Sequence, residues 1–153
     1  MKRTHHCNEL RLEHAGQEVT LSGWVHSRRD LGGVIFIDVR DREGRTQLVF
    51  DPQETDVALV EAAGKLHSES VITVSGKVRQ RPDETENSKI PTGQVEVVAA
   101  VMDVNNHAEV LPFQIDDPET AAKVNEELRL QYRYLDLRRP EIMRNMQLRS
   151  RVA

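Results

Sequence analysis

Residues 23–50 read GWVHSRRDLGGVIFIDVRDREGRTQLVF, and this stretch decides the fold predicted for the chain. It contains three short runs rich in β-branched and aromatic residues, separated by the polar segments RRDLGG and DREG. Short apolar runs bounded by glycine and aspartate are typical of strands joined by hairpin turns. The stretch therefore predicts three consecutive strands with a face that is basic and partly aromatic.

The flanking sequence predicts two more strands and a helix. Alternation of apolar and polar residues begins at Gln17, so the first strand starts there. Asp51, Pro52 and Glu54 have the order of an N-cap, a first helical residue and the acid of a capping box, which predicts a helix over residues 52–67. Residues 71–81 and 94–104 alternate again and are predicted to be strands four and five, joined by a polar loop at residues 82–93.

This order of elements predicts a mainly β fold, the OB fold. It is a five-stranded Greek-key barrel with one helix between strands three and four, and it binds oligonucleotides across strands two and three. The two loops that flank this face join strands one to two and four to five. Here they correspond to residues 28–33 and 82–93. A β-barrel whose surface arginines are merely solvated remains the alternative.

Composition describes a globular, water-soluble protein. Hydrophobic residues make up 38% and charged residues 30% of the 153, and no apolar run is long enough for a transmembrane helix. The N-terminus lacks the apolar core of a signal peptide, so we expect a cytoplasmic protein. The single cysteine, Cys7, cannot form an internal disulfide. Its neighbours His5 and His6 lack a second ligand cluster, so we predict ordinary packing and no metal site.

Charge is unevenly distributed behind a net value of −4. Residues 128–153 contain seven arginines and two acidic residues, whereas residues 51–75 contain one lysine and five acidic residues. Because net charge governs solubility and steering, a local basic face stays compatible with phosphate binding.

The character of the sequence changes after Val104. Residues 105–127 are acidic, contain Pro112 and Pro118, and are predicted to be a linker. Residues 128–139 fit both a helical and an alternating pattern, and their length favours a helix. A further helix is predicted from Pro140, and it reaches Ala153 without a stop signal, so we expect a piece of a longer protein. The predicted organisation is a barrel at 1–104, a hinge at 105–139 and the start of another domain at 140–153.

Three segments resemble the N-terminal region of bacterial-type aspartyl-tRNA synthetases, which are class II enzymes. They are the combination RRDLGG, FIDVRDREG and a following glutamine, the strand TGQVEV at 92–97, and LRLQYRYLDLRRPEIMRNMQLRSRV at 128–152. The resemblance covers essentially the whole chain. RYLDLRRP is shared in outline with the related enzymes for asparagine and lysine, and the first combination points to aspartate.

The resemblance implies an anticodon-binding domain joined by a hinge to a catalytic domain beyond Ala153. The family attaches aspartate to tRNA(Asp) with ATP and Mg²⁺ and forms homodimers. We therefore expect tRNA(Asp) as the partner of this chain, aspartate and ATP as partners through the absent domain, and no membrane. No catalytic residue, cofactor or metal ligand is expected within the chain. A stand-alone single-stranded nucleic-acid-binding OB fold is the alternative, and a protein-interaction barrel is a third possibility.

Three predicted anticodon-binding residues lie on strands. Phe36 can stack on a base, although a core position is its alternative. Gln47 carries both a donor and an acceptor for a base edge, and the resemblance assigns it to the middle anticodon base, a uridine. Glu96, predicted on the exposed face of strand five, can accept from a cytosine amino group.

The other predicted contacts lie in or near the two loops. Arg29 resembles the family's anticodon-contacting arginine, whereas Arg28 is expected to contact phosphate or water. Arg79 and Arg81 end strand four and are predicted to point toward the second loop, with plain surface charge as the alternative. Asn87 resembles a contact within that loop.

Leu31 and Glu84 bear on which tRNA is chosen. Family members that also charge the asparagine tRNA often have histidine at the first position and a small residue at the second. Leu31 and Glu84 therefore resemble the kind specific for the aspartate tRNA. Val49 stands where some members have an aromatic residue, which leaves stacking to Phe36.

Overall fold

The computed structural model describes residues 1–115 and 123–152 of the chain. These residues divide into two compact units, Met1–Glu109 and Val110–Ala153, and each unit is described by itself. The first contains the predicted barrel, and the second contains the C-terminal helices.

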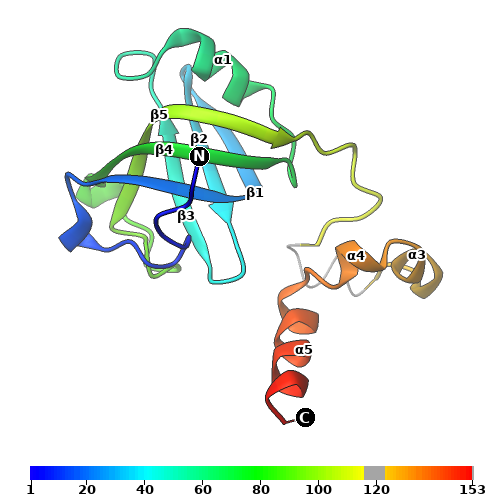
Figure 1. The fold of residues 1–153 in the computed structure, drawn as a ribbon. Helices are drawn as coiled ribbons and strands as arrows, with labels where there is room; N and C mark the ends of the chain where they lie inside the picture. The colour runs from blue at the N-terminus through cyan, green and yellow to red at the C-terminus, as the bar shows by residue number, and fades with distance from the viewer. Residues whose placement is uncertain (116–122, 153) are drawn as a thin grey trace. The chain divides into compact units, whose positions relative to one another are not determined.

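The first unit is a closed five-stranded barrel (Figure 1). Neighbouring strands follow the order β1-β2-β3-β5-β4, and every pair is antiparallel except β3 with β5, which is parallel. A helix, α1, lies between β3 and β4 in the sequence and packs against β2 and β3. This confirms the predicted OB fold. The bounds are Glu18–Leu31 for β1, Val34–Arg40 for β2, Arg45–Phe50 for β3, Val57–Gly64 for α1, Val71–Gln80 for β4 and Val95–Asn106 for β5.

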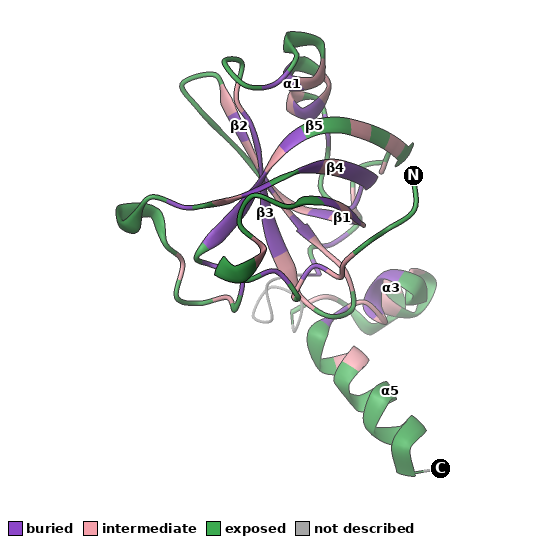
Figure 2. Ribbon diagram, turned by 60° about the vertical axis from the view of Figure 1, so that its left-hand side comes forward, coloured by how far each residue is buried: buried purple, intermediate pink, exposed green. Residues whose placement is uncertain are grey.

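Period-two alternation sorts each strand into a core face and an outer face. On β2, Ile35, Ile37 and Val39 are buried, while Phe36 and the polar residues between them are half-buried on the other side. Figure 2 shows the buried residues concentrated on the strands. Each fully buried aliphatic or aromatic side chain contributes about 1.5–3 kcal/mol, so the barrel interior supplies most of the stability of this unit. The remaining core strand residues are Val19, Leu21, Val25, Leu48, Phe50, Ile72, Val74, Val78, Val95, Val97 and Ala99.

The predicted loop at residues 28–33 is wrong, because β1 continues to Leu31. The reversal needs only Gly32 and Gly33, whose φ angles are +66° and +92°. Two consecutive positive φ angles make the two-residue hairpin turn that matches strand twist. Asp30 accepts a hydrogen bond from the Gly33 amide over 3.0 Å and fixes the turn. Arg29 therefore lies on a strand.

The predicted helix over residues 52–67 is too long at both ends, since α1 spans Val57–Gly64. Its N-cap is Asp56, whose carboxylate accepts from the Ala58 amide at 2.8 Å. Asp51 instead caps a separate turn and accepts from the Gln53 amide at 2.9 Å. Thr55 separates the two turns and donates its hydroxyl to the Ala99 carbonyl, which ties this connection to the barrel.

In the second unit the predicted helix over residues 128–139 is two short helices. They are α3, Glu126–Gln131, and α4, Arg133–Asp136, and the backbone breaks at Tyr132. A further helix, α5, spans Pro140–Val152 and starts where the sequence predicted. The linker predicted at 105–127 begins later than expected, because β5 continues to Asn106, and residues 116–122 lie outside the described residues.

Asp136 organises the described part of this unit. Its fully buried carboxylate accepts from Arg129 at 3.0 Å, Arg133 at 2.8 Å and Arg139 at 3.2 Å. Burial alone would raise the pKa of Asp136, but the hydrogen bonds from Arg129 and Arg139 outweigh it and hold the pKa below its ordinary value. One carboxylate thus joins residues of α3, α4 and the start of α5.

The helices in the described part of the chain are too short or too polar to span a bilayer.

Gly76 of β4 offers a test of how tightly the barrel closes. A Cβ added there would lie 2.0 Å from the Val98 carbonyl oxygen. Gly76→Ala must therefore move backbone, and we expect it to lower the free energy of unfolding by about 2 kcal/mol. Gly64→Ala is the matched control at the end of α1, where the nearest atom is 3.9 Å away. It should leave stability unchanged or raise it by up to about 1 kcal/mol. Equal effects in urea titrations would contradict this account.

Candidate nucleic-acid interface

The predicted anticodon-binding residues meet on the outer face of the barrel, where β1, β2, β3 and β5 run side by side. Arg29 of β1 pairs across the sheet with Phe36 of β2, and Asp38 of β2 pairs with Gln47 of β3. Side chains of such directly opposed residues are in contact range. Closure of the barrel between β3 and β5 then brings Glu96 to the other side of Gln47.

Phe36 lies on the outer face and does not belong to the core cluster, so the core alternative is wrong. The guanidinium carbon of Arg29 lies 5.9 Å from the centroid of its ring, a cation–π arrangement. The half-buried ring is held against the sheet and retains exposed surface on which a base can stack.

Gln47 is buried and its amide is held from both sides. Its Oε1 accepts from Nη2 of Arg29 at 2.9 Å, and its Nε2 donates to Oε2 of Glu96 at 2.9 Å. A guanidinium only donates and a carboxylate only accepts, so these neighbours fix which end of the amide is which. Gln47 is thus not a solvated side chain on the surface of the strand. One N–H and one lone pair of the amide remain for a ligand.

Glu96 was predicted to be exposed, and this is wrong, because only 3% of its surface is accessible. Gln47 and Arg79 cover it from β3 and β4. Arg79 donates from Nε at 3.0 Å and Nη2 at 2.8 Å to Oε1. Three donors occupy three of the roughly four lone-pair positions of the carboxylate, which leaves one acceptor position.

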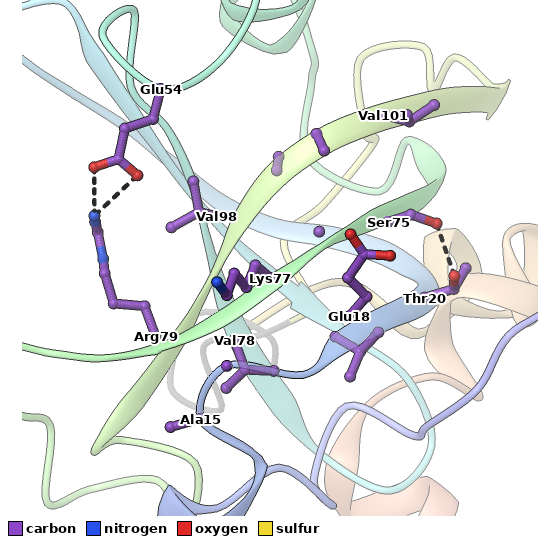
Figure 3. Close-up of a pocket in the computed structure, with 15 residues that line it drawn as sticks. Ala15, Glu18, Thr20, Glu54, Ser75, Lys77, Val78, Arg79, Val98 and Val101 are labelled. Carbon is purple, nitrogen blue, oxygen red and sulfur yellow. Dashed lines mark hydrogen bonds and ion pairs between the residues drawn. The ribbon is translucent and has the colours of Figure 1, made fainter.

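Glu54 supports Arg79 from outside the predicted site (Figure 3). Its carboxylate accepts from Nη1 of Arg79 at 2.9 and 3.2 Å. Burial would lower the pKa of Arg79, but the hydrogen bond and charge of Glu96, with the charge of Glu54, raise it above its ordinary value. The only sequence signal at Glu54 was its capping-box spacing, which gave no hint of this contact.

Arg81 is buried at the base of the site and not a plain surface charge. Its Nε donates to the Val95 carbonyl at 3.0 Å, and its buried Nη2 has no hydrogen-bond partner among the described residues. Burial lowers the pKa of Arg81, and the charges of Glu96 and Asp38 oppose this effect. A buried donor without a partner costs about 1–3 kcal/mol.

The remaining predicted residues lie at the edges of this face. Leu31 is 61% exposed at the tip of the β1–β2 hairpin. Glu84 is exposed in the short helix η2, Asp83–Thr85, of the loop between β4 and β5. Asn87 shapes that loop, because its Oδ1 accepts from the Lys89 amide at 3.0 Å. The hydrogen bonds that join Arg29, Gln47, Glu96 and Arg79 do not include these three residues.

A hollow of about 800 Å³ lies on the outer surface of β1, β4 and β5 (Figure 3). Glu54 and Arg79 stand at its edge, and Arg79 is the one predicted residue that lines it.

The adjacent His5, His6 and Cys7 are used in packing. His6 Nδ1 lies 2.9 Å from Oδ2 of Asp41, the ring of His5 packs edge-on against His14, and Cys7 is buried in the core. Within residues 1–115 and 123–152, no three His, Cys, Asp or Glu side chains are grouped to hold a metal ion.

Comparison with known proteins agrees with this geometry. Residues 19–104 match the family model for the tRNA anticodon type of "OB-fold nucleic acid binding domain". The chain belongs to this family of nucleic-acid-binding domains.

More specifically, the chain is similar to the N-terminal region of aspartate–tRNA ligases. It is 50% identical over all 153 residues to the aspartate–tRNA(Asp/Asn) ligase of Opitutus terrae, and 49% identical over 152 residues to the aspartate–tRNA ligase of Streptococcus pneumoniae. The chain spans about a quarter, 25%, of the length of each of these relatives. The asparaginyl-tRNA synthetase of Pyrococcus horikoshii, complexed with asparaginyl-adenylate, is 29% identical with a TM-score of 0.81, over 98% of this chain and 32% of that one.

We expect the charge of Glu96 to stabilise the arrangement of the arginines in the site. Glu96→Gln removes the charge that offsets Arg79 and the buried Arg81, and we expect the free energy of unfolding to fall by about 2–3 kcal/mol. Glu54→Gln makes the same chemical change on the exposed side of Arg79 and should cost less than about 1 kcal/mol. Denaturant unfolding of the two variants measures the difference, and equal losses would show that Glu96 does not offset buried charge.

Proposed function

We propose that this chain recognises the anticodon of tRNA(Asp) as the N-terminal part of an aspartate–tRNA ligase. The observation that carries the proposal is the Gln47 amide, held by Arg29 on one side and Glu96 on the other, beside the half-buried ring of Phe36. The family match and the ligase relatives support the same reading.

The fixed amide provides a way to tell uridine from cytosine at the middle anticodon position. Uridine presents O4, an acceptor, beside N3–H, a donor, whereas cytosine presents an amino donor beside N3, an acceptor. The two bases therefore show opposite orders to the one N–H and one lone pair left on Gln47. Because Arg29 and Glu96 prevent the amide from flipping, only one order is matched.

The groups around Gln47 would hold the RNA strand in place. A base stacked on Phe36 contributes about 1–3 kcal/mol without regard to sequence. The remaining acceptor position of Glu96 suits a cytosine amino group at the third anticodon base. The buried Nη2 of Arg81, which has no partner among the described residues, would supply a donor for a base or phosphate oxygen.

The proposal extends to the rest of the enzyme. A catalytic domain outside this chain would activate aspartate with ATP and Mg²⁺ and transfer it to the tRNA, in a cytoplasmic homodimer. Residues 140–153 would begin that domain. The chain itself would contribute recognition alone, and no residue in it is assigned a catalytic role.

Changing Gln47 tests base reading directly. Gln47→Ala should cost about 1–3 kcal/mol of discrimination between an aspartate tRNA anticodon stem–loop and one with the middle uridine replaced by cytidine. Arg28 lies on β1, one residue before Arg29. Arg28→Ala should weaken the binding of both RNAs equally and reduce the salt dependence of binding. Dissociation constants measured at two salt concentrations separate the two effects.

The outcomes also separate the competing functions. Indifference of the unaltered chain to the middle base would favour a stand-alone single-strand binder. Absence of salt-dependent binding to either RNA would favour a protein-interaction barrel.

Leu31 and Glu84 should restrict binding to the aspartate tRNA, because enzymes that also charge the asparagine tRNA often have other residues at these two positions. We expect the chain to bind tRNA(Asp) more tightly than tRNA(Asn), and Leu31→His together with Glu84→Gly to reduce that ratio several-fold. Competition between the two tRNAs for the chain measures the ratio. Equal affinity of the unaltered chain for both tRNAs would refute this assignment.

A further inference from the structure

A row of outward-facing side chains crosses β1, β2 and β3 next to the proposed anticodon site. Trp24 of β1 pairs with Arg40 of β2, and Arg40 pairs with Arg45 of β3. This row, Trp24–Arg40–Arg45, lies two residues along β2 and β3 from the Asp38–Gln47 pair, on the same face. Two residues of a strand span about 7 Å, so the row borders the site directly.

The row places two arginines at directly opposed strand positions, where like charges are destabilising unless they are neutralised. Arg40 is compensated, since it pairs with the buried carboxylate of Glu69 and lies 5.7 Å above the ring of Trp24. Arg45 forms no ion pair with a carboxylate in the described part of the chain.

His26 orients Arg45 without neutralising it. A bulge between Val25 and Ser27 leaves His26 as the extra residue of β1, and bulges of this kind re-aim side chains. Its Nε2 lies 2.8 Å from Nη1 of Arg45. Because a guanidinium can only donate, Nε2 must be the acceptor, and this contact requires the ring nitrogen to be unprotonated. The full positive charge of Arg45 is therefore retained on the sheet face.

We propose that the Trp24–Arg40–Arg45 row is a phosphate subsite for the RNA backbone just outside the anticodon triplet, with Arg45 as the principal ligand. The inference rests on the proposed function, because an RNA strand that crosses Phe36 and Gln47 would continue onto this row. Arg45 carries a positive charge without a carboxylate partner in the described part of the chain, and an arginine can bind two oxygens of one phosphate. Continuity with the base-reading residues favours a phosphodiester of the same strand over a separate acidic ligand.

Neutral linkages in the RNA test the subsite. Each phosphate flanking the triplet of an anticodon stem–loop is replaced in turn by an uncharged methylphosphonate, and affinity for the chain is measured. We expect one replacement to weaken binding about tenfold, as loss of a charged hydrogen bond predicts. Arg45→Gln should weaken the unmodified RNA by a similar factor and abolish sensitivity at that one position, because the two changes remove the same contact.

The chain offers a close control and a rescue. Arg42 lies in the turn between β2 and β3, with 68% of its side chain exposed and its partner in the adjacent Glu43. Arg42→Gln removes the same charge three residues from Arg45 and should leave the phosphate sensitivity intact. Arg45→Lys keeps the charge and should retain most of the sensitivity, which also separates loss of contact from loss of folding.

The possible failures are distinguishable. If the middle base is read but Arg45→Gln and every methylphosphonate act additively, the phosphate subsite is refuted and anticodon recognition stands. If the middle base is not read, the proposed function fails first. If Arg42→Gln abolishes the sensitivity to methylphosphonate as fully as Arg45→Gln does, the effect is one of general charge and the subsite is refuted.

Discussion

The parallel pairing of β3 with β5 is the contact on which both the barrel and its site depend. It rests on two residue pairs, Leu48 with Val97 and Val49 with Val98. Closing the barrel here buries Leu48 and Val97 in the core. The same closure sets Gln47 beside Glu96, although 49 residues separate them in the sequence. The stability of the barrel and the geometry of the proposed site therefore share one structural cause, and weakening the β3–β5 pairing would release the Gln47 amide.

Sequence periodicity was enough to predict the strands, their order and which side chains face outward. Phe36 and Gln47 could be predicted on the outer faces of β2 and β3, because period-two alternation depends only on local sequence. The burial of Glu96 could not be predicted, since it follows from two strands that close over it from different parts of the chain. Glu54 was missed for the same reason, because its contact with Arg79 depends on the path of the connection after β3.

Local signals failed where two of them compete. Asp51 and Asp56 both have cap geometry, and the structure uses the first for a turn and the second for α1. The polar run before Gly32 looks like a loop by composition, yet two glycines suffice for the turn and leave Arg29 on the strand. A rigid strand gives Arg29 the fixed position that a pinned Gln47 needs, which a flexible loop would not provide.

The chain has a net charge of −4, but arginines gather on the face of the proposed site. Glu96, Glu69 and Asp38 offset arginines that lie partly or wholly buried, but Nη2 of Arg81 has no partner among the described residues. These are costs to stability concentrated on one face, as expected where a protein keeps groups for a ligand instead of for packing. A chain that is negative overall gains little from non-specific attraction to RNA. The affinity that we propose for RNA must then come from this one face, where the Phe36 ring and the arginines hold the RNA strand irrespective of sequence and Gln47 selects the base.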